Sequence, residues 1–79
     1  MMGTGLRTVI LSRHAAERMI QRGITQDEVE ATIRTPDTHS PGNTTYAERF
    51  ERDFPPAKRL VVIAEKVGDD YKIVTTYWV

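Results

Sequence analysis

The chain is short, free of cysteine and without net charge. It has 79 residues, 39% of them hydrophobic, with 11 basic residues against 11 acidic ones. This length predicts one small domain with a thin core and excludes a two-domain enzyme. The absence of cysteine excludes disulfide scaffolds, thiolate metal sites and thiol nucleophiles, and it favours a cytoplasmic location. Because the chain carries no net charge, nucleic-acid binding would require a local basic surface.

The beginning of the chain is not expected to act as a signal peptide. Residues 1–5 lack the long apolar stretch of a signal peptide, so we expect a flexible N-terminal tail there. No apolar run approaches the roughly 20 residues that a membrane span requires, and no membrane partner is expected. Residues 6–79 are predicted to form a single domain, whose thin core a homodimer or a partner protein would complete. Within it, residues 6–11 are rich in Val, Ile and Leu and predict an opening strand.

A first amphipathic helix is predicted from Ser12, its N-cap, to Arg22. Gly23 follows as the residue that ends the helix in a left-handed conformation. At about 100° per residue, the apolar side chains share one arc and the polar side chains lie opposite. The apolar set is Ala15, Ala16, Met19 and Ile20, and the polar set is His14, Glu17, Arg18, Gln21 and Arg22. This distribution predicts an amphipathic helix.

A second helix has the clearest local signal in the chain. Thr25 followed by Glu28 is a capping box, in which each side chain bonds the backbone N–H of the other residue. Val29 and Ile33 are expected to form the buried stripe. Pro36 ends the helix, because the residue before a proline avoids helical backbone angles.

The second half of the chain changes to strand spacing. Residues 36–43 are dense in turn formers and predict a loop. Strands are predicted at residues 44–49, 59–67 and 71–79, and the second of these is apolar on both parities, as in a central strand. Residues 53–57 hold two prolines and predict a connection. The expected fold is α+β, with two N-terminal helices packed on an antiparallel sheet of three to four strands in the order β-α-α-β-β-β.

Neither a metal site nor a cofactor is predicted. The only two histidines, His14 and His39, stand far apart in the sequence and lack the spacing of paired metal ligands. The chain contains neither a phosphate-binding glycine loop nor a G-x-S-x-G nucleophile motif.

The most informative polar pattern is a ladder on the first helix, formed by His14, Arg18 and Arg22. Residues four apart stack along one helix face, so these side chains point the same way. One interpretation is a solvated face whose charge Glu17 and nearby carboxylates neutralise. The other is an anion site, because guanidinium groups bind phosphate through paired hydrogen bonds and histidine exchanges a proton near neutral pH. The second interpretation supplies the groups needed for phosphodiester chemistry.

A second basic cluster surrounds the proline connection, and aromatic residues accompany it. The basic residues are Arg49, Arg52, Lys58 and Arg59, and the aromatic residues are Tyr46, Tyr71, Tyr77 and Trp78. If the ladder lies over the same edge of the sheet, phosphate contacts and base stacking would hold a nucleotide together. The alternative is that the aromatic side chains on the last strand belong to the core.

Several of these residues occur in one recognisable run, His14-Ala-Ala-Glu-Arg18-Met-Ile-Gln-Arg22-Gly23-Ile24-Thr25. It resembles the small bacterial domain-of-unknown-function family 4258, which opens with H-A-x-x-R-M-x-x-R-G-I-[ST]. That family ends on a strand of the type V-x-T-x-[YW], matched by Ile73-Val-Thr75-Thr-Tyr77. The resemblance covers nearly the whole chain from Leu11.

The resemblance implies a topology similar to RelE-type toxins and other small ribonucleases that need no metal. It places His14, Arg18 and Arg22 on the open side of the sheet, with Thr75 and Tyr77 on the last strand. The implied reaction is attack of a ribose 2′-hydroxyl on its own phosphate, with His14 as acid or base. The arginines would stabilise the pentacoordinate phosphate, and Tyr77 would stack a base or donate a proton. RNA and an antitoxin-like protein are the implied partners.

A rival hypothesis is a non-catalytic interaction module that forms a homodimer or binds a small partner. A thin core and a free sheet edge suit strand addition or helix packing. In that case Arg18 and Arg22 would form salt bridges with acidic residues of the partner or of the chain itself. Salt-sensitive RNA binding would favour the first hypothesis, and salt-indifferent self-association the second.

Overall fold

The computed structural model describes residues 9–42 and 44–79, which form two helices and a 5-stranded sheet. In chain order the elements are β1 (Val9–Leu11), α1 (Arg13–Arg22), α2 (Gln26–Arg34), β2 (Thr38–Pro41), β3 (Ala47–Phe54), β4 (Lys58–Val67) and β5 (Asp70–Trp78). The α+β class and the two N-terminal helices are confirmed. The expected tail at residues 1–5 and the first half of the expected opening strand lie outside the described residues.

The sheet differs from the prediction in its size and its mixed character. Its strand order is β1-β5-β4-β3-β2, with β2 to β5 antiparallel and β1 parallel to β5. The prediction of three to four antiparallel strands is therefore wrong. One of the two causes is β1, whose parallel pairing with β5 makes the sheet mixed. A strand of 3 residues is too short for its sequence to indicate the strand with which it pairs.

The second cause is β2, which lies within the predicted loop at residues 36–43. Its turn-forming residues are tolerated because β2 is an edge strand, where one side of the backbone needs no partner. Next along the chain, β3 begins at Ala47 and continues to Phe54, so it starts later and ends later than the predicted strand. The antiparallel pairing with β4 sustains it through its charged residues.

Both helices begin and end as their capping residues predict. Ser12 accepts a hydrogen bond from the backbone N–H of Ala15, and Gly23 ends α1 in the left-handed conformation at φ 66°. In α2, Thr25 and Glu28 form the reciprocal capping box, with distances of 2.9 Å and 3.2 Å. Local sequence alone determines these three helix ends because each cap needs only neighbouring residues.

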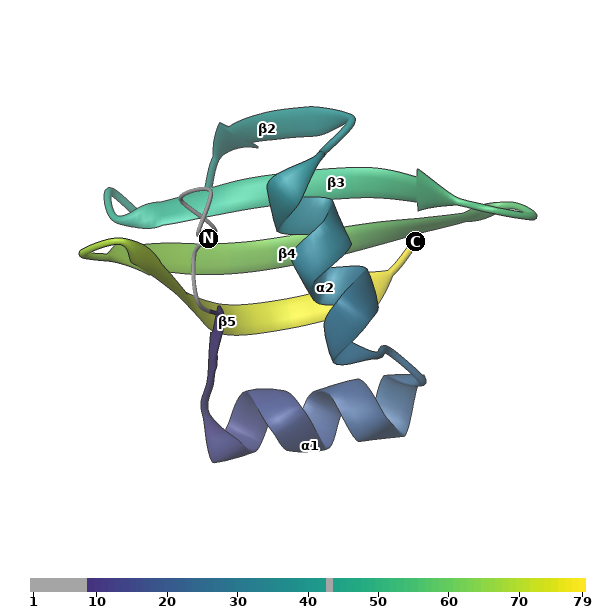
Figure 1. The fold of residues 1–79 in the computed structure, drawn as a ribbon, viewed down its shortest axis with the longest axis horizontal. Helices are drawn as coiled ribbons and strands as arrows, with labels where there is room; N and C mark the ends of the chain where they lie inside the picture. The colour runs from purple at the N-terminus through teal and green to yellow at the C-terminus, as the bar shows by residue number, and fades with distance from the viewer. Residues whose placement is uncertain (1–8, 43) are drawn as a thin grey trace, which may run out of the picture.

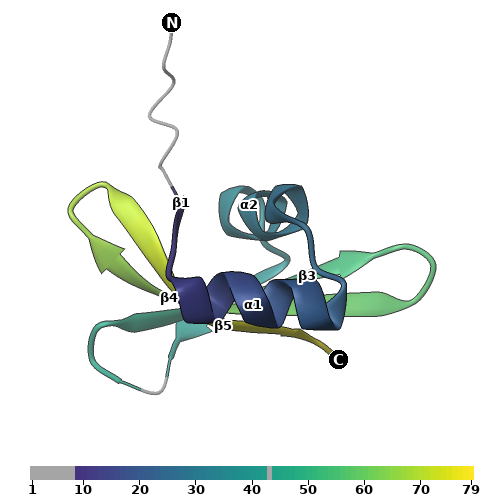
Figure 2. The same ribbon diagram turned by 90° about the horizontal axis from the view of Figure 1, so that it is seen from below.

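The two helices contact different parts of the sheet. α2 crosses β3 and β4, whereas α1 runs alongside β5 and the short β1 (Figures 1 and 2). Ala15 and Met19 of α1 are buried, but Ile20 is 81% exposed. Ile20 shares the apolar arc of the helical wheel but lies outside the core. The sheet meets α1 on the side of Ala15 and Met19, which turns Ile20 toward solvent.

The main core lies between the helices and the sheet. It contains Val29 from α2, Phe50 from β3 and Leu60 from β4, together with Met19 and Ile73. A smaller cluster of Ala47, Val61 and Ile63 lies on the opposite face of the sheet. β4 therefore contributes apolar side chains to both faces, which confirms the predicted central strand.

Candidate functional site

The candidate residues fall into three places in the fold. His14, Arg18 and Arg22 lie on α1, whereas Arg49, Arg59, Thr75 and Tyr77 lie on the face of the sheet opposite the core helices. Arg52, Lys58 and Tyr46 lie elsewhere. This division follows from the strand register, because side chains of directly paired residues point to the same face.

The ladder on α1 ends against β5. Nη1 of Arg22 donates to the carbonyl oxygen of Thr76 at 2.9 Å, and the indole Nε1 of Trp78 donates to the carbonyl oxygen of Arg22 at 3.0 Å. His14 is exposed and Arg18 is half-buried. The last turn of α1 is therefore fixed to the end of β5 by two hydrogen bonds. One nitrogen of the Arg22 guanidinium is used in this contact.

The charge of the ladder is not neutralised by the carboxylate that the sequence offers. Glu17 forms its ion pair with Arg13, at 3.6 Å from Arg13 Nε. Glu17 is therefore the ion-pair partner of Arg13 and not of Arg18 or Arg22. Within the part of the chain that the structure describes, neither Arg18 nor Arg22 has a carboxylate partner. α1 consequently presents an excess of positive charge.

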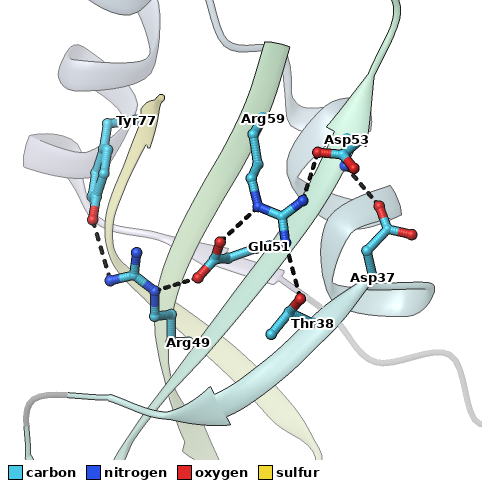
Figure 3. A network of polar contacts seen from close by, with 7 residues as sticks. All are labelled: Asp37, Thr38, Arg49, Glu51, Asp53, Arg59 and Tyr77. Atoms are coloured by element: carbon cyan, nitrogen blue, oxygen red, sulfur yellow. Dashed lines mark hydrogen bonds and ion pairs between the residues drawn. The ribbon is translucent and has the colours of Figure 1, made fainter. Parts of the chain in front are cut away.

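The uncovered face of the sheet holds a network of charged and hydroxyl groups (Figure 3). The two oxygens of Glu51 accept from Nε of Arg49 at 2.6 Å and from Nε of Arg59 at 2.7 Å. Arg59 also donates to Asp53 at 2.5 Å and to Oγ1 of Thr38 at 2.9 Å. Nη1 of Arg49 lies 3.4 Å from the hydroxyl of Tyr77. The neighbouring strands β2, β3, β4 and β5 thus contribute to one polar surface.

The ion pairs of this network shift the pKa values of its members. The hydrogen bonds from Arg59 and then from Arg49 lower the pKa of Glu51, against a smaller opposing effect of burial. The hydrogen bond to Glu51 raises the pKa of Arg49, and the bonds to Glu51 and Asp53 raise that of Arg59. Glu51 is therefore held in its ionised form, as a bridge between two cations.

The ladder and the network approach each other at the end of β5. Arg22 contacts the backbone of Thr76, and the next residue, Tyr77, contacts Arg49 from the other face. Thr75 lies on the uncovered face because it is paired with Ile63, which is also paired with Arg49. Both groups of candidate residues thus touch the C-terminal half of β5.

Three candidate residues stand apart from both groups. Nη1 of Arg52 donates to the carbonyl oxygen of Thr35 at 2.6 Å, which places a cation at the C-terminal end of α2. Nζ of Lys58 lies 5.0 Å from the centre of the Trp78 ring. Tyr46 is 77% exposed in the segment before β3. The first two contacts stabilise the fold, so the predicted basic cluster does not form a single patch.

The sequence did not show which individual partners Arg49 and Arg59 take, namely Glu51, Asp53 and Thr38. The available signal was the charge alternation along β3, where Arg49, Glu51 and Asp53 recur at the period of two that places side chains on one face. A second missed pair is His39 and Glu48, which lie 2.7 Å apart on the core-helix side of the sheet. The ring of His39 stacks on Phe50, with centroids 4.3 Å apart.

The structure shows neither a metal cluster nor a membrane helix in its described part. No group of three or more His, Cys, Asp or Glu residues within residues 9–42 and 44–79 is arranged to hold a metal ion. Neither of the two described helices is long and apolar enough to cross a membrane.

Comparison with known proteins identifies a family. The model of the domain of unknown function DUF4258 matches residues 11–78, and the chain therefore belongs to this family. The match spans both helices, the sheet from β2 to β5, and every candidate residue described above. No curated protein and no solved structure matches the chain.

Proposed function

We propose that this domain binds single-stranded RNA through α1 and the end of β5, and that it cleaves RNA as a RelE-like, cytoplasmic ribonuclease without a metal. The observation that carries the proposal is the uncompensated charge of Arg18 and Arg22. Unpaired guanidinium groups on one helix face are suited to successive phosphates. Arg22 is already oriented by its bond to Thr76, so less conformational entropy is lost when it binds.

The proposed reaction uses the ladder and the last strand. His14 accepts the proton of a ribose 2′-hydroxyl while the 2′-oxygen bonds to phosphorus. Arg18 and Arg22 donate to the non-bridging oxygens and stabilise the added negative charge. The bond from phosphorus to the 5′-oxygen then breaks, leaving a 2′,3′-cyclic phosphate and a 5′-hydroxyl. Tyr77 stacks a neighbouring base or supplies the proton that the leaving oxygen takes up.

The test is cleavage of a labelled single-stranded RNA in the presence of EDTA. Wild-type protein is compared with His14→Ala, Arg18→Ala and the matched control Arg13→Ala, all at equal folding by circular dichroism. Arg13 lies on the same helix but is paired with Glu17, so its loss should leave cleavage unchanged. Cyclic phosphate ends that disappear in the His14 and Arg18 variants, with rates reduced by about 10²-fold or more, are expected. Unchanged cleavage in Arg18→Ala would refute the assignment.

A second candidate function is an interaction module that binds an antitoxin-like protein or a second copy of the chain. The observation that favours it is Ile20, an aliphatic side chain left almost fully exposed on the same helix as the unpaired arginines. Sedimentation at several protein concentrations separates the two functions. Self-association that is lost in Ile20→Ser and kept in Arg18→Ala would support the interaction module and contradict the RNA site.

A further inference from the structure

A carboxylate lies between two guanidinium groups on the uncovered face of the sheet. One oxygen of Glu51 is 2.6 Å from Nε of Arg49, and the other is 2.7 Å from Nε of Arg59. The Glu51 side chain is 18% exposed and those of Arg49 and Arg59 are 36% and 30% exposed, so the three groups are open to solvent. Two guanidinium groups around one oxyanion are also the arrangement that binds a phosphate group.

The two arginines differ in how many of their donors are in use. Arg59 bonds through Nε to Glu51, through Nη1 to Asp53 and through Nη2 to Thr38, so all three nitrogens have partners. Arg49 bonds strongly only through Nε, and its Nη1 has a long contact to the hydroxyl of Tyr77. Nη2 of Arg49 has no hydrogen bond to the described residues. Arg49 therefore retains free donors beside the position of Glu51.

We infer that Glu51 occupies the position of a ligand's phosphate, and that the uncovered face binds a phosphate monoester or inorganic phosphate by displacing this side chain. The charges of Arg49, Arg59, Glu51 and Asp53 sum to zero, so an added anion must replace Glu51 to be stable there. A phosphate monoester brings three terminal oxygens to this position, one more than the two of the carboxylate, and so offers the surrounding donors an additional acceptor. A phosphodiester has a single charge and two terminal oxygens, as the Glu51 carboxylate does, so the exchange adds no acceptor.

The surroundings match those extra acceptor oxygens. Nη1 and Nη2 of Arg49 lie on one side, and the hydroxyl of Tyr77 lies beside them. The Oγ1 of Thr38 and the fixed guanidinium of Arg59 lie on the other side. The ring of Tyr77 offers a face for the base of a nucleotide. This anion site does not include the ladder on α1, and Tyr77 is the residue that it shares with the proposed RNA-cleaving groups.

The experiment is a titration of the isotope-labelled full chain, followed through the Nε–Hε resonances of Arg49 and Arg59. The probes are inorganic phosphate, adenosine 5′-monophosphate and, as the diester, dimethyl phosphate. Phosphate and the nucleotide should shift both resonances, and dimethyl phosphate at the same concentration should not. Equal shifts with dimethyl phosphate, or no shift with any probe, would overturn the inference. This test uses the wild-type protein and needs no substitution.

Variants then test the displacement itself. Glu51→Gln keeps an oxygen acceptor but removes the charge, and it should bind phosphate about tenfold more tightly, equivalent to about 1.4 kcal/mol. Arg49→Gln should abolish binding, whereas Arg34→Gln, which removes an exposed charge from α2, should leave it unchanged. A folded Glu51→Gln protein with unchanged affinity contradicts the displacement.

A further variant identifies the ligand class. If the nucleotide binds more tightly than inorganic phosphate and Tyr77→Ala removes the difference, the natural ligand is a nucleotide with a terminal phosphate. If both probes bind equally, the site accepts free phosphate. Both results support the anion site. RNA cleavage is measured on the Glu51→Gln and Arg49→Gln samples, in which the ladder and Tyr77 are intact, so loss of the ladder function and loss of this site are distinguished.

Discussion

The salt dependence of RNA binding gives a quantitative test of the ladder on α1. Each phosphate contact of a single strand contributes about −0.7 to the slope of log K against log salt concentration. Arg18 and Arg22 have no carboxylate partner, so together they should contribute about −1.4. Between about 50 mM and about 200 mM salt, this contribution alone corresponds to a loss of about sevenfold in affinity. The double variant Arg18→Ala/Arg22→Ala should lack that part of the salt dependence.

The assay is fluorescence anisotropy of a labelled single-stranded RNA at several salt concentrations. Arg18 makes no hydrogen bond within the described chain, so Arg18→Ala should change the free energy of unfolding by less than about 0.5 kcal/mol. The single variant should reduce the slope by about half as much as the double variant. Arg13→Ala is the charge-matched control because Glu17 already pairs with Arg13. A slope that changes equally in Arg13→Ala and Arg18→Ala would refute a specific role for the ladder.

Three further predictions concern the fold that positions the site. Lowering the pH should destabilise the domain through Glu51, because the pKa of Glu51 is lower in the folded state than in the unfolded state. The stabilisation that ionised Glu51 provides is complete above about pH 4.3, the ordinary glutamate value. It is lost as the pH falls through the lower folded pKa. Acid unfolding of Glu51→Gln should lack this component; identical acid transitions would contradict it. Thr25→Ala should cost about 1 kcal/mol in urea unfolding, because the backbone N–H of Glu28 loses the Thr25 hydroxyl as its acceptor; an unchanged urea midpoint would contradict this. Val29→Ala, at a fully buried core position, should cost about 1–3 kcal/mol, and a loss below about 0.5 kcal/mol would mean that this core is loosely packed.

The helices were predictable because their signals are local. Ser12, Gly23 and the Thr25–Glu28 box fix where each helix begins or ends, and each acts on backbone groups no more than a turn away. The central position of β4 was predictable for a similar reason. A strand that is apolar on both parities must be covered on both faces, whatever its neighbours are.

The partners of the strands were not predictable from the sequence. β2 contains residues typical of turns, and only pairing with β3 makes it a strand. Ile20 fits an apolar arc on a helical wheel, but the position of β5 against α1 leaves it exposed. Both differences arise because the conformational preference of a single residue contributes little free energy. Tertiary contacts contribute more and therefore override it.

The candidate site shows the same division. The sequence by itself determines that His14, Arg18 and Arg22 share a helix face, because that spacing depends only on helix geometry. Only the tertiary structure decides that Glu17 pairs with Arg13, that Arg22 reaches Thr76, and that Glu51 bridges two arginines from neighbouring strands. Charge neutralisation depends on distances across the sheet and around the helix, and those distances are set by the packing of the whole chain.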